Sequence, residues 1–298
     1  MTIDLTGRVA IVTGAGGGLG REHALLLARR GAKVVVNELD AAAAERVVAE
    51  IMDAGGEAIA APASVTDVAQ VEAMVADTIA RWGHIDILVN NAGILRDRSF
   101  AKMGLDDFRL VMEVHVMGAV HCTKAVWDHM RERNYGRIVM TTSSSGLYGN
   151  FGQSNYGAAK MALVGLMQTL AIEGARSDIR VNCIAPTAAT AMTEGPLPPE
   201  VIARLSPAAV SPGLLALVAE DAPTRTILCA GAGSYQQAHI TMTQGIHVGA
   251  GDDAAEQVAA RWSEIGDPNG ATVPQAGSAQ GMLEIGRAVS ATAGAEAL

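Results

Sequence analysis

The sequence predicts an α/β fold in which a doubly wound, parallel, seven-stranded sheet carries helices on both faces, as a single domain with a C-terminal extension. Short runs rich in Val, Ile and Leu alternate with longer helical patterns between residues 8 and 230. Strands that are apolar on both faces are typical of a parallel sheet buried on both sides. The chain has 298 residues, of which 49% are hydrophobic, so it can build one large core and still have residues left for an appendage.

Seven runs of five or six residues have the composition of buried strands. Their length favours strands, because helices usually need about ten residues or more. The expected strands are residues 8–13, 33–37, 57–61, 86–90, 137–142, 180–184 and, as the weakest, 226–230.

The segments between these runs carry helix signals. Gly31 ends the first expected helix, Gly55 and Gly56 end the second, and Asp67 is a suitable N-cap for the third. The expected helices are residues 19–30, 41–54, 67–82, 105–133 and 155–175. Right-handed crossovers between such units bring the carboxyl ends of the strands to one edge, where ligands bind.

Two segments fall outside this alternation. Residues 187–212 are rich in Pro, Ala and Thr and follow the sixth strand, so we expect a lid over the strand ends. We expect residues 1–250, lid included, to form the α/β domain. Residues 251–298 are expected to form an extension, a helix followed by an Ala- and Gly-rich tail with a short helix near residues 282–289.

Composition excludes several classes of protein. A net charge of −9 and an aromatic content of 3% argue against a nucleic-acid surface. We find no apolar run of about 18 residues that would cross a membrane, and no signal-peptide pattern. The three Cys are widely spaced and no metal-ligand motif occurs, so we expect reduced thiols, no metal and a cytoplasmic location.

A glycine-rich turn links the first strand to the first helix, in the segment Thr13-Gly14-Ala15-Gly16-Gly17-Gly18-Leu19-Gly20. Glycines let the backbone N–H groups approach a pyrophosphate, and the helix N-terminus adds a positive dipole end. Between a strand and a helix this turn predicts a dinucleotide-binding (Rossmann) fold. We therefore expect Gly14, Gly16, Gly18, Leu19 and Gly20 to contact the cofactor.

An acidic residue at the end of the second strand indicates which dinucleotide binds. Glu38 lies 24 residues after Gly14, near the spacing of an acid that binds the ribose hydroxyls. A carboxylate there accepts hydrogen bonds from NAD and repels the 2′-phosphate of NADP. The sequence thus predicts NAD, with Asp40 as the rival acid if the strand ends later.

A Ser, a Tyr and a Lys predict the chemistry. Tyr156 and Lys160 are four residues apart and share a helix face, and Ser143 follows the fifth strand. Oxidation of a hydroxyl to a carbonyl needs a base, and a free Tyr has a pKa of about 10. A nearby ammonium would lower that pKa, and a Ser hydroxyl would orient the substrate oxygen. We expect Tyr156 to be the base.

Together these residues resemble the short-chain dehydrogenase/reductase family over about residues 5–230. The motifs are TGxxxGxG, the NNAG at residues 90–93, Ser143, and the YxxxK of Tyr156 and Lys160. The resemblance implies catalytic roles for Ser143, Tyr156 and Lys160, the last two also binding cofactor. It further implies cofactor contacts at Ser64, Val65, Asn90, Ala92 and the backbone near Ala188, and a strand-steadying role for Asn91.

Two positions depart from the family pattern. His115 stands where a catalytic Asn is usual, and Thr187 replaces the Gly of a Pro-Gly pair. His115 either takes over that Asn's part in the proton relay or only packs. Both departures, however, are found in one branch of the family, the (3R)-hydroxyacyl-CoA dehydrogenase units of peroxisomal multifunctional enzymes and their stand-alone bacterial relatives. The sequence closely resembles that branch in the stretches NNAGILRDRSFAKM, VHVMG, YGNFGQSNYGAAK and AIEGARSDIRVNCIAPTA.

That branch implies an acyl-CoA substrate, NAD, and a homodimer or homotetramer, with no nucleic-acid or membrane partner. The exposed-loop residues Arg96, Arg98 and Lys102 could meet the CoA phosphates, or simply face solvent. The alternatives are a hydroxysteroid or other secondary-alcohol dehydrogenase, a 3-oxoacyl thioester reductase, and a non-catalytic NAD-binding regulator, against which the intact Ser143, Tyr156 and Lys160 argue.

Overall fold

The computed structural model describes residues 2–190 and 198–296. It divides the chain into two compact units, Met1–Ala238 and His239–Leu298. The boundary expected near residue 250 falls inside the second unit, and the assignment of the two segments as domain and extension stays a prediction.

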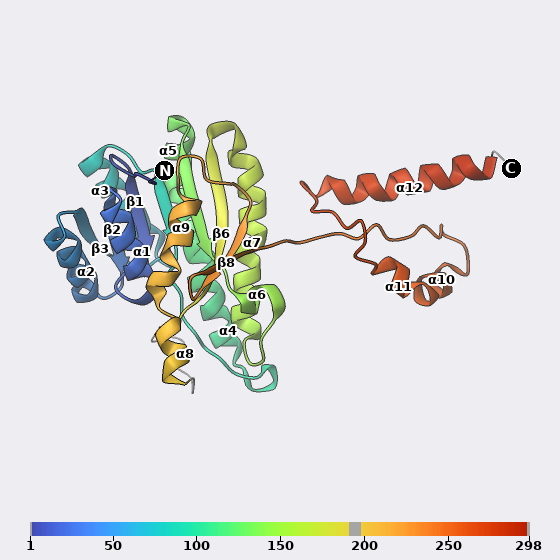
Figure 1. Cartoon of the computed structure of the whole chain (residues 1–298), viewed down its shortest axis with the longest axis horizontal. Coiled ribbons are helices and arrows are strands. Elements are labelled where there is room, and N and C mark those ends of the chain that lie inside the picture. The colour runs from blue at the N-terminus through green and yellow to red at the C-terminus, as the bar shows by residue number, and fades with distance from the viewer. Residues whose placement is uncertain (1, 191–197, 297–298) are drawn as a thin grey trace. The chain divides into compact units, whose positions relative to one another are not determined.

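The first unit is built on one sheet (Figure 1). The strand order is β3-β2-β1-β4-β5-β6-β7-β8, and β1 to β7 are all parallel. Order 3-2-1-4-5 places the switch point between β1 and β4, where a doubly wound sheet binds its ligand. The strands are β1 (Val9–Thr13), β2 (Lys33–Glu38), β3 (Glu57–Pro62), β4 (Ile87–Asn90), β5 (Gly136–Thr141), β6 (Ile179–Thr187), β7 (Ile227–Gly231) and β8 (Ser234–Ala238).

The predicted number of seven strands is too low by one edge strand. β8 pairs antiparallel with β7 through a turn in which Ala232 and Gly233 both have positive φ, 50° and 74°. Such a turn joins two antiparallel strands directly. The strand sequence Ser-Tyr-Gln-Gln-Ala is mostly polar and exposed, so it lacks the apolar run by which the buried strands were found.

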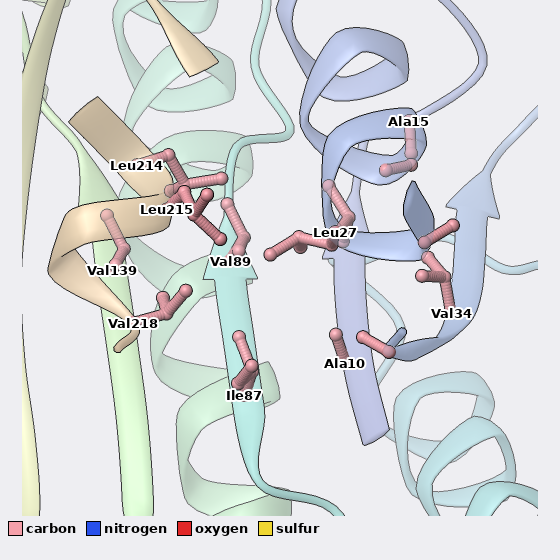
Figure 2. Packing of buried hydrophobic residues seen from close by; sticks show 14 of the residues in the cluster. Ala10, Ala15, Leu27, Val34, Ile87, Val89, Val139, Leu214, Leu215 and Val218 are labelled. Carbon is pink, nitrogen blue, oxygen red and sulfur yellow. The ribbon is translucent and has the colours of Figure 1, made fainter. Parts of the chain in front are cut away.

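Helices cover both faces and create two cores. On one face α1 (Gly18–Arg29), α2 (Ala41–Asp53) and α9 (Ser211–Leu217) pack on the sheet. Figure 2 shows Leu27 of α1 and Leu214 of α9 reaching toward Val89 of β4. On the other face lie α3 (Val68–Trp82), α5 (Gly118–Arg133) and α7 (Ser154–Gly174). The central strands β1, β4 and β5 are buried along their whole length because helices cover both sides of the sheet.

The helix predicted over residues 105–133 has those bounds in the structure, but it is not α-helical throughout. It comprises α4 (Leu105–Met112), a π-helical turn at Glu113–Met117, and α5. A π turn inserts one residue and often marks a functional site. At the start of α5, a Cβ on Gly118 would lie 2.6 Å from Val65 Cγ2, so the helix approaches the end of β3 closely.

The predicted lid lies partly outside the described residues, since residues 191–197 are not among them. Its described part includes α8 (Pro199–Arg204) and a 3₁₀ turn at Pro207–Ala209. The window Glu200–Leu217 is apolar and long enough to cross a membrane by composition. In the structure it comprises most of α8, this turn, which begins at Pro207, and α9, which has Pro212 in its first turn, so it is not one helix.

The second unit is more helical than predicted. It contains α10 (Ala254–Ala260), α11 (Trp262–Ile265) and α12 (Ser278–Glu296). The short helix expected near residues 282–289 therefore extends through most of the segment expected to be a tail. Alanine has the highest helix propensity, and it is frequent in α12 despite the neighbouring glycines.

Two short helices border the site described next. They are α6 (Ser144–Tyr148), which follows β5, and a 3₁₀ turn at Phe100–Lys102, which precedes α4.

Candidate active site

The glycine turn after β1 is so tightly folded that several of its positions have no room for a side chain. Gly14 and Gly18 have φ of +62° and +52°, which glycine adopts readily. A Cβ on Gly20 would lie 2.2 Å from Gly14 O, and one on Gly14 would lie 2.8 Å from Ala92 Cα. Helix α1 begins at Gly18, directly after the turn, and presents its N-terminus there. These glycines allow backbone contacts that side chains would block.

Asn91 fastens this turn to the end of β4. Its Nδ2 donates to Thr13 O at 2.9 Å and to Gly14 O at 3.1 Å. Thr13 Oγ1 in turn accepts from the backbone N–H groups of Asn91 and Ala92, both at 3.0 Å. Sequence reasoning missed this role of Thr13 in holding the end of β4. The signal that could have indicated it is its position as the last residue of β1.

Glu38 faces the turn, while Asp40 does not. Glu38 Oε2 accepts from Gly16 N at 3.3 Å, and Oε1 accepts from Leu39 N at 2.8 Å. Asp40 is the N-cap of α2 and accepts from Ala42 N at 3.0 Å. The two acids considered for the ribose site thus have different surroundings, and Glu38 is the one beside the glycines.

The residues after β3 lie at the same edge of the sheet. Asn37 Nδ2 donates to Ala61 O and Ala63 O, which fixes the chain just before Ser64. Val65 is buried, and its carbonyl is 3.0 Å from His121 Nδ1. Ser64 and Val65 therefore have defined positions next to the switch point between β1 and β4.

Ser143, Tyr156 and Lys160 are brought together by β5 and α7. Ser143 is the N-cap of α6 and is hydrogen-bonded to Tyr156. The Lys160 Nζ lies 5.4 Å from the centroid of the Tyr156 ring and donates to Thr141 O at 2.6 Å. A hydroxyl, a phenol and an amine thus form one cluster at the carboxyl end of β5.

Burial dominates the acid–base properties of this cluster. It lowers the pKa of Lys160 to about 7. It also raises the pKa of Tyr156, an effect that the hydrogen bond with Ser143 opposes and the charge of Asp97 reinforces. The lowering of the Tyr156 pKa by Lys160 that the sequence suggests is not among these effects.

His115 lies in the π turn, against the end of β4. Burial and the nearby Lys160 lower its pKa to about 3, so the ring is neutral at physiological pH. Its Nε2 is 2.8 Å from Ile94 O and 3.1 Å from Ile94 N. Its ring meets the Tyr156 ring edge-on, with centroids 5.3 Å apart. A neutral ring held in this way cannot act as a cationic acid near pH 7.

Two loops form one wall beside the cluster. Arg98 N donates to Gly152 O at 2.9 Å, and Asn155 Nδ2 donates to Arg96 O at 3.0 Å. Gln153 accepts from Ser145 Oγ and donates to Asp97. The side chains of Arg96, Arg98 and Lys102 are exposed along this wall. Sequence reasoning missed the bridging role of Gln153, for which no motif exists.

The other residues predicted to contact the cofactor, Ala188 and Asn90, also lie near this edge of the sheet. Ala188 directly follows β6 and packs on the core beneath α9. Ala189 N donates to Leu205 O at 2.7 Å, which joins the start of the expected lid to its described end. Asn90 is buried and donates from Nδ2 to Thr123 Oγ1 at 3.0 Å. All of these positions lie at or next to the carboxyl edge of the sheet.

This donor set suits a nicotinamide dinucleotide. Gly14 and Gly20 let the turn fold closely on itself and on Ala92, where a Cβ would clash, α1 offers its N-terminus, and Glu38 supplies acceptors beside the turn. With the cofactor bound along this edge of the sheet, Lys160 and Tyr156 would hold the nicotinamide ribose.

Comparisons with known proteins agree with this geometry. Residues 8–198 match the family described as short chain dehydrogenase. A Mycobacterium tuberculosis protein described as a short-chain type dehydrogenase/reductase is 45% identical over 276 residues, covering 89% of this chain and 96% of that protein. Peroxisomal multifunctional enzyme type 2 of Drosophila melanogaster is 50% identical over 257 residues, covering 83% of this chain but only 41% of that enzyme.

Solved structures give the same result. The full-length Drosophila enzyme superposes with a TM-score of 0.79 at 43% identity, covering 94% of this chain and 49% of that one. A 7α-hydroxysteroid dehydrogenase complexed with NADH and 7-oxo glycochenodeoxycholic acid gives a TM-score of 0.72 at 33% identity, covering 78% of this chain and 95% of that one. The chain therefore belongs to the short-chain dehydrogenase family and is an oxidoreductase that uses a nicotinamide cofactor.

Proposed function

We propose that the chain transfers a hydride between NAD and C3 of a (3R)-3-hydroxyacyl-CoA, whose 3-hydroxyl becomes a carbonyl. The observation that carries the choice of NAD is the position of Glu38, whose carboxylate lies beside Gly16. A 2′-phosphate at that place would meet a negative charge. The acyl-CoA part rests on the similarity to multifunctional enzyme type 2 and on the sequence motifs of that branch.

In this proposal Tyr156 takes the proton of the substrate hydroxyl. Ser143 holds the same oxygen by a hydrogen bond and orients it toward Tyr156. The bound nicotinamide supplies the acceptor for the hydride. Lys160, whose pKa is about 7, is partly charged at neutral pH and gains charge as a phenolate forms next to it. The phenolate forms before the substrate hydroxyl loses its proton, and it becomes a phenol again when it takes that proton.

The wall of the site offers charge for the CoA phosphates. We propose that Arg96, Arg98 and Lys102 supply it, because the chain as a whole carries a net charge of −9 and would otherwise repel CoA. Arg98→Ala should raise the KM for acyl-CoA without changing the KM for NAD. Arg109→Ala is the matched control, because Arg109 is exposed and paired with Asp106 in α4.

A hydroxysteroid alcohol is the second candidate substrate, favoured by the similarity to 7α-hydroxysteroid dehydrogenase. Reduction of a 3-oxoacyl thioester is the same chemistry in reverse. A screen with NAD and NADP would compare a (3R)-3-hydroxyacyl-CoA, its (3S) epimer, the free acid and a steroid alcohol. We expect the (3R) thioester with NAD to give the highest kcat/KM. Equal turnover of the free acid, or faster turnover of the steroid, contradicts the proposal.

We also propose that the chain forms a homodimer or homotetramer in the cytoplasm. The support is a set of exposed apolar side chains on α4, the π turn and α7, namely Leu110, Met117, Met161 and Ile172. Exposed apolar surface of this kind favours association. Light scattering of the purified chain tests the assembly, and a monomer at micromolar concentration would contradict it.

A further inference from the structure

A small cavity beside the turn at residues 90–93 is lined by two residues that have unpartnered polar atoms. Its volume is ≈ 10 Å³, and Val114, Ala119 and Leu163 form part of its apolar wall. Asn90 and His115 line it as well. Within residues 2–190 and 198–296, Asn90 Oδ1 and His115 Nδ1 are among the few buried atoms without a protein hydrogen-bond partner. Buried polar atoms are normally paired, so each needs a partner.

Both unpartnered atoms are acceptors. The Nδ2 of Asn90 is used by Thr123 Oγ1, which leaves Oδ1 as the unpaired end of the amide. His115 Nε2 lies 3.1 Å from Ile94 N and 2.8 Å from Ile94 O. We assign the ring proton to Nε2 on the shorter contact, because a carbonyl oxygen can only accept. The ring is neutral and carries one proton, and His115 Nδ1 is therefore left with a lone pair.

We propose that this cavity holds one ordered water that donates to Asn90 Oδ1 and to His115 Nδ1, and that His115 is thereby a positioning residue for Tyr156. A volume of ≈ 10 Å³ is about one water-sized sphere and excludes larger ligands. A water has two O–H groups, and the two orphan atoms are both acceptors. The proposal goes beyond the proposed function, because the water does not depend on which alcohol is the substrate.

His115 contacts the reacting phenol of Tyr156 directly, so the orientation of the His115 ring affects the position of Tyr156. Its ring meets the Tyr156 ring at an interplanar angle of 85°. The ring also lies against the turn at residues 90–93, since a Cβ on Gly93 would be 2.2 Å from His115 Cε1. Nε2 is fixed by Ile94, and the water would fix Nδ1. The ring then has one orientation, and the Tyr156 ring packs against it.

The water is tested on the unaltered protein. A high-resolution crystal structure should show an ordered water within hydrogen-bond distance of Asn90 Oδ1 and His115 Nδ1. In ¹⁵N-histidine NMR, His115 should be the Nε2–H tautomer with a hydrogen-bonded Nδ1. A dry cavity, or the Nδ1–H tautomer, overturns the proposal.

The positioning role is tested by His115→Phe, which keeps a ring against Tyr156 but removes both nitrogens. We expect kcat to fall about 10-fold, because small displacements of a reacting group are costly, while the KM for NAD stays unchanged. His129→Phe is the control, since His129 lies in α5 and contacts Ile85 N at the far end of β4. Ala119→Val fills the cavity with His115 intact and should lower kcat similarly. Unchanged kcat in both cavity variants overturns the role.

Discussion

The carboxylate of Glu38 accepts a hydrogen bond from the backbone N–H of Gly16, with 3.3 Å between Oε2 and N. The last residue of β2 and the glycine turn after β1 thus meet at the edge where the cofactor is expected. A Cβ on Gly16 would lie 2.7 Å from Glu38 Cγ, so the contact is close. Selection between NAD and NADP would be made at this contact.

Glu38→Ala should narrow the preference for NAD over NADP. The carboxylate that repels a 2′-phosphate is lost, and the ratio of kcat/KM values should fall by about 10-fold or more. Asp40→Ala is the matched control, because Asp40 is a helix cap and should affect stability rather than the ratio. If Asp40→Ala changes the ratio and Glu38→Ala does not, the cofactor acid has been assigned to the wrong residue.

Gly20→Ala should abolish tight cofactor binding. The new Cβ would lie 2.2 Å from Gly14 O, so the turn must shift. We expect the Kd for NAD to rise at least about 10-fold, which corresponds to about 1.4 kcal/mol. Gly165→Ala in α7, where a Cβ meets nothing within 4 Å, is the control and should bind normally. Fluorescence titration measures both; equal Kd values would show that the turn tolerates a side chain.

The cofactor turn and the Tyr156–Lys160 pair were predictable because the spacing of their residues in the sequence determines how they are arranged in space. Four residues of helix place two side chains on one face, and a strand–glycine–helix order leaves few conformations. β8 was not predictable, since a polar edge strand has no apolar period. The π turn at Glu113–Met117 was not predictable either, because it changes the backbone path without changing residue types. The neutral state of His115 was not predictable, because it depends on burial and on the charge of Lys160, which is distant in the sequence.

Acid should destabilise the first unit partly through His23. This side chain is fully buried, 2.8 Å from Ser211 Oγ, and burial lowers its pKa to about 3. The unfolded chain binds a proton below about 6.5 while the folded chain does not, so stability falls as pH drops from 6.5 toward 3. By this linkage the loss at pH 5 relative to pH 7 is up to about 2 kcal/mol from this residue.

Urea unfolding at pH 7 and pH 5 measures that difference. His23→Gln should reduce the pH dependence, whereas His247→Gln, an exposed histidine of the second unit, should leave it as it is. His115 also has a pKa of about 3 and lowers stability in acid in the same way, so part of the pH dependence should remain in the His23 variant. A His23 variant with the full pH dependence would refute this assignment.

Removal of the Asp86 carboxylate should strongly lower the free energy of unfolding. It is fully buried at the start of β4, where it accepts from Val9 N at 2.9 Å and contacts Arg8, Arg133 and His84. Asp86→Ala removes the acceptor of the buried Val9 N–H and one ion-pair partner from each of Arg8 and Arg133, and we expect a loss of about 3–5 kcal/mol.

Asp128→Ala is the matched control for that change. Asp128 pairs with Lys124 and Arg131 on the exposed side of α5, so its loss should cost less than about 1 kcal/mol. Chemical denaturation of the two variants compares them directly. Similar losses would mean that burial of Asp86 does not decide its contribution.

In the proposed reaction, Tyr156 takes the proton from the substrate hydroxyl while NAD accepts the hydride. The test is the rate of NADH formation from a (3R)-3-hydroxyacyl-CoA by Tyr156→Phe, with NAD binding measured on the same sample. Tyr148→Phe, in which an exposed phenol is removed, is the control. We expect Tyr156→Phe to bind NAD normally but to form NADH at least about 10³-fold more slowly. A Tyr156→Phe variant that forms NADH at the rate of the unaltered enzyme would show that another group is the base.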